Sequence, residues 1–485
     1  MTDVVQSEHE DVFVRMGTEH TTKLLLEYSL PALAGLMVQV LYSVVDAIFI
    51  GNGVGQIGLA VTTVAFPMLT LMTALSMLVG TGGNALAAIR LGENNKQEAE
   101  VILGHCFTML LVTSAVVFGI SVLAMEPILR ISGAIDEVVP LASSFLTILT
   151  GGFIFQAAGF GMNNFIRTTG APMRAFLTMV VGAVCNIVLD YLFVIRFGWG
   201  IDGAAWATVI AWAVSAATVL MYFVSAKAPL RLRACNLRLG FHLDMRILAL
   251  GMPAAILQLG TMVVVLFENH LLTFYGASDP LFGVDGALAV MSVLGRVGGF
   301  VVLPATAFAL GSQPIIGFCY GARMYDRMYA TLKQAIAMGI AVTTPLWAVT
   351  LVFPDAISML FGLDQAYWDS TARFMIYYLA LCPIIPIQII GSNYFEATGQ
   401  ATKASLLTLT RQFIFLIPLL LWCPAHLPSL FPISSLESIF LSATISDVTS
   451  CLVVLVALVP EIHRLKARQA GEGCEHEDLH PEACV

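Results

Sequence analysis

The sequence has very little charge for its length. Asp, Glu, Lys and Arg together make up 11% of the 485 residues, whereas about a quarter of a typical soluble domain is charged. Residues 101–124 contain none of the four, and residues 180–195 contain only Asp190. Together with a hydrophobic fraction of 58% and a mean hydropathy of +0.86, this deficit excludes a soluble globule and predicts an integral membrane protein.

Several motifs with known chemistry are also missing from the sequence. It contains no Walker motif, no Ser-His-Asp grouping and no nucleotide-binding segment, which disfavours an enzyme and transport powered by ATP on this chain. The nine cysteines lie mostly in apolar segments, so they predict packed thiols rather than a disulfide framework. Residues before Lys23 are polar and acidic, and we therefore expect the first apolar segment to stay in the membrane. We expect no cofactor, no resident metal and no nucleic-acid partner.

The most informative feature that is present is an internal repeat. Residues 29–32 (SLPA) return as residues 251–254 (GMPA), and an acid follows each proline by fifteen residues, Asp46 in the first copy and Glu268 in the second. Residues 164–170 return as residues 393–399. At the same offset of 229, Gly82, Gly92 and Ala175 correspond to Gly311, Gly321 and Ala404. Two copies of one membrane unit, each with an acid in its first helix, are typical of a secondary transporter.

Apolar stretches of about 20 residues predict an all-α membrane fold of twelve spans. We expect a cytoplasmic amino-terminal tail (1–22), an N-lobe of six helices (23–226), a cytoplasmic linker (227–245), a C-lobe of six helices (246–465) and a disordered cytoplasmic tail (466–485). The expected helices are 24–50, 57–89, 99–125, 138–159, 173–197, 201–224, 246–275, 286–318, 328–353, 370–392, 403–423 and 436–460.

The distribution of Lys and Arg predicts the orientation of the chain. If the amino terminus is cytoplasmic, most of the 23 Lys and Arg residues fall on the cytoplasmic side, and only Arg130, Arg196 and Arg373 fall outside. The positive-inside rule then places both termini and the linker in the cytoplasm. Because six is an even number, both repeats start on the same face and are parallel repeats.

Four polar residues of the first half are expected to share one site. Asp46, Asp190 and Thr208 lie within about one helical turn of a common depth, at about 1.5 Å per residue. Asn186 is one turn from Asp190 on the same helix face. With no Lys or Arg expected nearby, these oxygens suit a proton shared between two carboxyl groups, and equally a small hard cation such as sodium. The alternative is a structural role in which Asp46 caps an unwound helix end or bonds a neighbour.

The second half carries acids and bases together in its membrane segments. Glu268, Arg296, Arg411 and Asp447 form a possible polar network or substrate surface. The alternative is one or two internal salt bridges that hold the bundle together. A functional role is favoured for Glu268, because it occupies the repeat position of Asp46.

Pro31 lies in the same predicted helix as Asp46. A proline in a helix interior removes a backbone hydrogen bond and can kink the helix. We therefore consider Pro31 a hinge whose bend responds to the charge of Asp46, with a static, packed kink as the alternative.

The carboxyl-terminal tail holds a possible zinc ligand set. Cys474, His476, His480 and Cys484 have spacings that could bind the metal. The stretch is short, acidic and terminal, however, so we expect a solvated tail instead.

Longer motifs resemble a known family. They are Ser29-Leu30-Pro31, Asp46-Ala47-Ile48-Phe49-Ile50-Gly51, Arg167-Thr168-Thr169-Gly170-Ala171-Pro172, Asn186-Ile187-Val188-Leu189-Asp190, Gly203-Ala204-Ala205-Trp206-Ala207-Thr208 and Ala397-Thr398-Gly399-Gln400. With them the chain resembles the multidrug and toxic compound extrusion (MATE) transporters, and more closely their bacterial branch related to the DNA-damage-inducible F proteins.

The resemblance implies two six-helix lobes around a V-shaped cavity that alternates between the two membrane faces. It places the cation site at Asp46, Asn186, Asp190 and Thr208. It also shows Glu396 where related chains often have Gln.

We therefore expect a secondary exporter of organic, often cationic and lipophilic compounds, working as a monomer in a bacterial inner membrane. The coupling ion is expected to be a proton, with sodium as the alternative. We expect the substrate to lie between the lobes against residues such as Met37, Phe153 and Phe300. The alternative function is a flippase or exporter of a lipid-linked or other specific metabolite. Such proteins generally need several cavity arginines, and only Arg296 and Arg411 qualify here.

Overall fold

The computed structural model describes residues 14–132, 134–225, 228–277, 279, 282–361, 363 and 365–479. In this part of the chain every regular element is helical. Eleven helices are long and apolar enough to span a membrane, and a twelfth span results if one bent pair is counted as a unit. The chain is therefore a multi-pass membrane protein, as the composition predicts.

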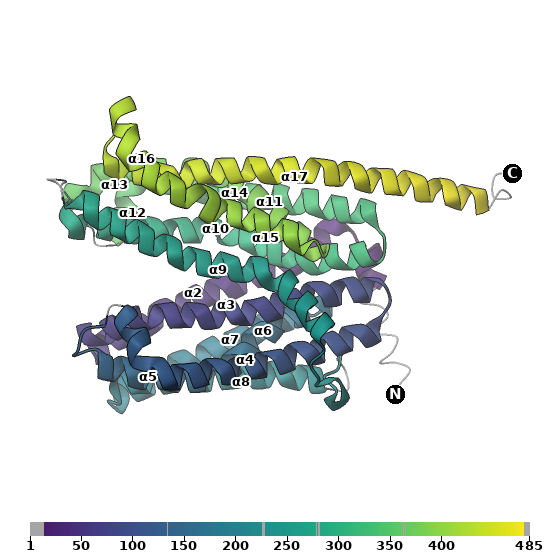
Figure 1. The fold of residues 1–485 in the computed structure, drawn as a ribbon, viewed down its shortest axis with the longest axis horizontal. Helices are drawn as coiled ribbons and strands as arrows, with labels where there is room; N and C mark the ends of the chain where they lie inside the picture. The colour runs from purple at the N-terminus through teal and green to yellow at the C-terminus, as the bar shows by residue number, and fades with distance from the viewer. Residues whose placement is uncertain are drawn as a thin grey trace.

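The helices form two lobes that lie one above the other in Figure 1, the N-lobe in purple and blue and the C-lobe in teal to yellow. The N-lobe contains α2 (Thr21–Gly53), α3 (Gln56–Gly92), α4 (Lys96–Ile131), α5 (Val139–Gly151), α6 (Phe153–Thr168), α7 (Pro172–Asp190) with the π-helical η1 (Tyr191–Arg196), and α8 (Gly200–Val224). The C-lobe contains α9 (Phe241–Gly276), α10 (Gly283–Gly321), α11 (Tyr325–Val352), α12 (Pro354–Leu360), α13 (Trp368–Leu379), α14 (Ile385–Ala397), α15 (Ala401–Leu409) with the π-helical η5 (Thr410–Leu416), α16 (Ile417–Leu430) and α17 (Ser435–Leu479).

Three spans depart from straight α-helices in ways that the hydropathy pattern did not predict. The fourth span is bent by 51° between α5 and α6, and Gly152 at the break packs so closely on Val209 that a side chain would overlap it. The fifth span of each lobe contains a π-helical segment, η1 after Asp190 and η5 before Ile417. Such segments are rare and occur frequently at functional sites.

The expected disordered tail is only partly consistent with the structure. Helix α17 continues to Leu479 and passes beyond the rest of the bundle on the right of Figure 1. The expectation was wrong for residues 466–479, because strong helix formers follow the last apolar turn and extend the helix (LKARQA, residues 465–470). Residues 1–13 of the amino-terminal tail, and His480 and Cys484 of the possible zinc set, lie outside the described residues.

The two lobes meet at one end of the molecule. We call it the linker end, because the connecting segment, with its short helix η2 (Ala234–Asn236), lies there. Side chains added to Gly92 and Gly321 would overlap the carbonyl oxygens of Phe318 and Ile89, respectively. Each glycine thus packs on the backbone of the other lobe at the position that the repeat makes equivalent. The contact has the self-complementary form of a two-fold interface.

A second pair of glycines repeats this arrangement. A side chain on Gly82 would overlap the backbone of α9 at Ile247 and Gly251, and one on Gly311 would overlap Ser29 of α2. These glycines are the ones that mark the repeat in the sequence. Small residues are what allow membrane helices to approach this closely.

The apolar cores show where the lobes separate. One core joins the N-lobe to the linker-end half of the C-lobe, and includes Leu86, Ile315 and Phe318. The second core belongs to the C-lobe alone and includes Leu272 and Phe440. The lobes therefore form a V that is closed at the linker end.

We predict that Gly92→Leu will force the lobes apart at the linker end. Helices usually pack about 8–10 Å apart, and a leucine removes the closer approach that glycine allows. Spin labels on the exposed Lys96 and Lys333 should report a distance that is longer by a few ångströms than in the parent. Gly119→Leu is the matched control, since nothing lies within 4 Å of a Cβ at that position. An unchanged distance in Gly92→Leu would refute the tight closure.

Candidate functional site

A cavity of about 410 Å³ lies inside the N-lobe. Residues from α2, α3, α5, α6, α7 and α8 line it, and Thr306 and Leu310 of α10 close it from the C-lobe side. The lining is largely apolar but contains many hydrogen-bonding side chains. These are Gln39, Tyr42, Ser43, Asp46, Thr62, Thr73, Gln156, Asn163, Asn164, Arg167, Asn186, Thr208 and Ser215.

The two carboxyl groups predicted from the sequence lie together at this cavity. Asp46 projects from α2 into it, and the carboxyl group of Asp190, the last residue of α7, interacts with that of Asp46. Asp190 is completely buried, with 0% of its surface exposed. Neither acid forms an ion pair with a Lys or Arg in the described part of the chain. Two acids this close in an apolar environment cannot both keep their charge, so the pair is suited to hold a proton.

Asn186 and Thr208 complete the predicted group. The Asn186 side-chain amide donates a hydrogen bond to the Thr208 hydroxyl at 3.4 Å, which joins α7 to α8. The Asn186 carbonyl oxygen is buried without a donor. So are Oδ1 of Asp46 and both carboxyl oxygens of Asp190. These unsatisfied oxygens form an acceptor-rich site that suits either a proton or a small hard cation.

Pro31 lies far from this group along the same helix. α2 runs unbroken from Thr21 to Gly53 with Pro31 inside it. Fifteen residues separate Pro31 from Asp46, which is about 22 Å at 1.5 Å per residue. Pro31 is buried near the linker end, two residues after Ser29. A bend at Pro31 would therefore act on the inter-lobe contact.

Of the four charged residues predicted for the C-lobe, Glu268, Arg411 and Asp447 lie near the side chain of Tyr378. The Arg411 side chain donates to Asp447 at 2.7 Å. Glu268 is buried in α9, with 5% of its surface exposed. Arg296 is exposed and forms no ion pair within the described ranges. The structure thus contains the internal salt bridge that the sequence left as an alternative, between Arg411 and Asp447.

The apolar part of the cavity also differs from expectation. Phe153 is in the core with 1% of its surface exposed, and Met37 and Phe300 are exposed residues outside the cavity lining. Hydropathy alone does not say which side of a helix faces a cavity, and a substrate position between the lobes against these residues stays a prediction. The cavity is lined instead by residues such as Met72, Met179, Phe155 and Trp212.

A buried polar chain that the sequence analysis missed crosses between the lobes. The Thr168 hydroxyl donates to Asn84, the Asn84 amide donates to Gln313 at 3.3 Å, and Gln313 donates to Glu396 at 3.3 Å. Asn84 and Gln313 are 229 residues apart, so they are equivalent positions of the repeat. That offset is the signal that could have revealed the pair.

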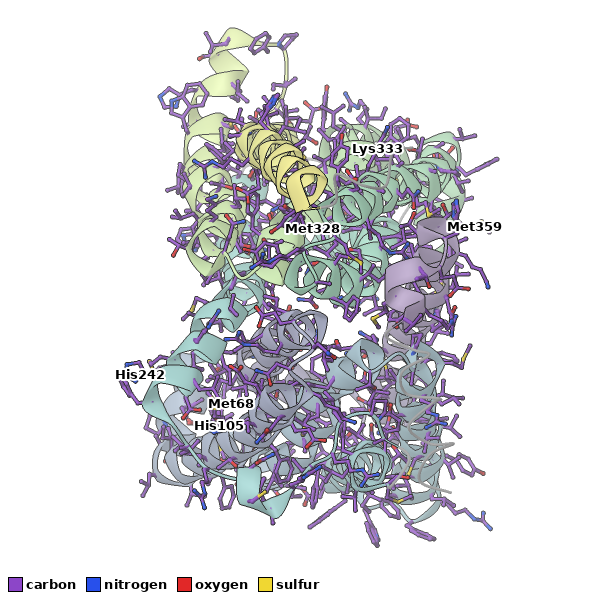
Figure 2. All side chains as sticks on the ribbon, turned by 90° about the vertical axis from the view of Figure 1, so that its right-hand side faces the viewer. Met68, His105, His242, Met328, Lys333 and Met359 are labelled. Carbon is purple, nitrogen blue, oxygen red and sulfur yellow. The ribbon has the colours of Figure 1, made fainter. Side chains whose placement is uncertain are left out.

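The linker is tied to the N-lobe at the same end. Glu100 of α4 pairs with Arg233 at 3.0 Å, and the His105 ring lies 2.7 Å from the Asp244 carboxylate at the start of α9. Figure 2 shows His105 beside the first turns of α9, where His242 is labelled. The entry of the chain into the C-lobe is thereby held against α4.

Comparisons with known proteins agree with this architecture. The chain is 25% identical over 349 residues to the probable multidrug resistance protein YoeA of Bacillus subtilis, covering 70% of this chain and 73% of that protein. It is 22% identical over 399 residues to the multidrug export protein MepA of Staphylococcus aureus (strain NCTC 8325), covering 82% and 86% of the two chains. A solved structure described as an outward-facing multidrug resistance MATE family transporter matches with a TM-score of 0.85 at 21% identity, covering 94% and 98%.

The family model MatE matches residues 31–192 and 265–422, one segment in each lobe. These segments contain most of the cavity and the inter-lobe contacts described above. The chain belongs to the MatE family.

Proposed function

We propose that this protein is a secondary multidrug exporter that moves organic compounds, often cationic and lipophilic, outward in exchange for protons. The observation that carries the proposal is the carboxyl pair of Asp46, which is half-buried and lines the cavity, and Asp190, which is fully buried behind it, without a basic partner in the described residues. An unpaired acid at membrane depth is expensive and is generally functional. The names of the relatives YoeA and MepA support multidrug substrates.

The proposed setting is a bacterial inner membrane with the linker end in the cytoplasm and a single chain as the working unit. In this orientation the described state is closed toward the cytoplasm. A proton from outside is shared by Asp46 and Asp190 and removes the negative charge that holds a cationic substrate in the cavity. The substrate then leaves outward. Bending of α2 at Pro31 opens the linker end, where the proton departs and the next substrate enters.

The flippase alternative is not favoured by the positions of the arginines. Arg411 is neutralised by Asp447, and Arg296 is exposed. The two side chains therefore do not form the paired phosphate site that a lipid-linked precursor would need.

We predict that Asp46→Asn and Asp190→Asn will each reduce export of a fluorescent organic cation by more than about tenfold, because an amide cannot take up and release the coupling proton. The measurement is efflux from proteoliposomes that contain equal amounts of folded protein. Asp136→Asn is the matched control, since the Asp136 side chain is 87% exposed. Normal export in both cavity variants would refute the role of the pair.

We predict that a pH gradient alone will drive export in the same liposomes, and that a sodium gradient alone will not. The reason is that a proton satisfies two facing carboxyl groups without further ligands, whereas sodium needs several oxygen ligands. If only a sodium gradient drives export, the coupling ion at Asp46 and Asp190 is sodium and not a proton. Export that follows neither gradient would exclude antiport with either ion.

The salt bridge of the C-lobe is expected to be structural. We predict that Asp447→Ala will lower the melting temperature, because Arg411 is left without its counter-ion. The decrease in the free energy of unfolding should be smaller than the roughly 3–5 kcal/mol that follows when one partner of a fully buried pair is removed. The reason is that the Arg411 side chain is 23% exposed. The double variant Arg411→Met/Asp447→Leu should recover most of the stability and keep export. A stable double variant that no longer exports would show that the pair acts in transport.

A further inference from the structure

We propose that the N-lobe cavity has a second, anion-binding subsite at Arg167, which takes the carboxylate or sulfonate group of a zwitterionic organic substrate. This inference rests on the proposed exporter function and deepens it. The cavity would then accept molecules that carry both a cationic and an anionic group, in addition to simple organic cations.

Arg167 is a buried cation without a counter-ion. Only 5% of its surface is exposed, and it forms no ion pair with any residue that the structure describes. Its guanidinium donates to the side-chain oxygen of Asn164 at 2.9 Å and to the sulfur of Met179 at 3.7 Å. Both partners are neutral, so the positive charge is left uncompensated in an apolar region, where it favours an anion.

Arg167 lies at the wall of the cavity, as one of the residues that line it. Its two terminal nitrogens each donate one hydrogen bond, to Asn164 and Met179. The Nε atom has no acceptor among the described residues and is not completely buried, so it can donate to a molecule inside the cavity.

The fold itself does not require a cation at this position. Arg167 lies in the last turn of α6, where the helix dipole stabilises a positive charge to a limited extent. The repeat places Glu396 at the equivalent point of α14 in the C-lobe, and Glu396 is held by Gln313. An acid at the matching helix end shows that the structural position tolerates the opposite charge. The positive charge of Arg167 is thus better explained by a role at the cavity than by a role in the fold.

The carboxyl pair and Arg167 lie at different levels of the N-lobe. Met179, which contacts Arg167, and Asp190 of the carboxyl pair are both on α7. Eleven residues separate them, which is about 16 Å along the helix. A fitting substrate therefore carries a basic nitrogen and an acidic group at separate ends of an apolar body, which packs against Met179 and Trp212.

A matched pair of fluorescent probes tests the subsite. Nα-dansyl-lysine carries an ammonium and a carboxylate, and dansylcadaverine is the same molecule without the carboxylate. We expect Arg167→Gln, in the purified full chain, to weaken binding of Nα-dansyl-lysine by about tenfold or more, as is typical for loss of a charge-assisted hydrogen bond. Binding of dansylcadaverine should change by less than about twofold, which also shows that the cavity is still folded.

Two further variants act as controls. Arg167→Lys should restore much of the affinity for Nα-dansyl-lysine, because it keeps the charge. Arg174→Gln should affect neither probe, since Arg174 is an exposed cation that lies over Tyr222 rather than in the cavity.

The outcomes separate this inference from the proposed function. Equal weakening of both probes by Arg167→Gln, or failure of the parent to bind Nα-dansyl-lysine, would overturn the anion subsite. Export of dansylcadaverine from proteoliposomes is measured independently. If the parent does not export it while Arg167 still discriminates between the probes, the subsite stands and the exporter function falls.

Discussion

The arrangement of the whole molecule depends on backbone contact between the two lobes at the linker end. Gly92 and Gly321 pack on the opposite lobe, and so do Gly82 and Gly311. A side chain at any of them would overlap the other lobe, so the contact exists only because these positions have no Cβ. Since both lobes contribute equivalent glycines, the interface has the symmetry of a homodimer built from one chain. Because the lobes are in contact at the linker end, the V opens at the opposite end of the molecule. The same contact places α10 against the cavity of the N-lobe.

The symmetry of the scaffold is combined with an asymmetry of charge. In the C-lobe Asp447 is neutralised by Arg411 at 2.7 Å, so this pair gains little from taking up a proton. In the N-lobe Asp46 and Asp190 interact with each other and have no basic partner among the described residues, and Arg167 has no acidic partner among them. Charges that are already compensated stabilise one arrangement, whereas uncompensated charges respond to whatever enters the cavity. The repeat therefore supplies a common helical frame, and the N-lobe cavity combines this frame with a carboxyl pair and an arginine that are not neutralised by opposite charges among the described residues.

Sequence periodicity and charge were enough to predict the two six-helix repeats and to bring Asp46, Asp190, Asn186 and Thr208 to one depth, because a helix converts residue number directly into height. They were not enough for features that depend on rotation about the helix axis. Phe153 was expected near the substrate and is in the core, and Arg167 was not expected at the cavity although it lines it. The bend at Gly152 and the π-helical turns depend on packing partners that hydropathy does not identify.

The distance between the carboxyl pair and the linker end limits how the two can be linked. Asp46 and Ser29 are seventeen residues apart on α2, which is about 25 Å, too far for a direct electrostatic effect through packed helices. α2 is, however, one unbroken helix that carries Asp46 at the cavity and Ser29 against Gly311 at the interface. A change in the curvature of α2 at Pro31 would move Ser29 relative to Gly311. The two residues are packed so closely that a side chain on Gly311 would overlap Ser29, so such a movement must change the contact. A continuous helix that bends at Pro31 and a tight glycine contact are therefore sufficient to join the two regions, without a continuous chain of polar residues between them.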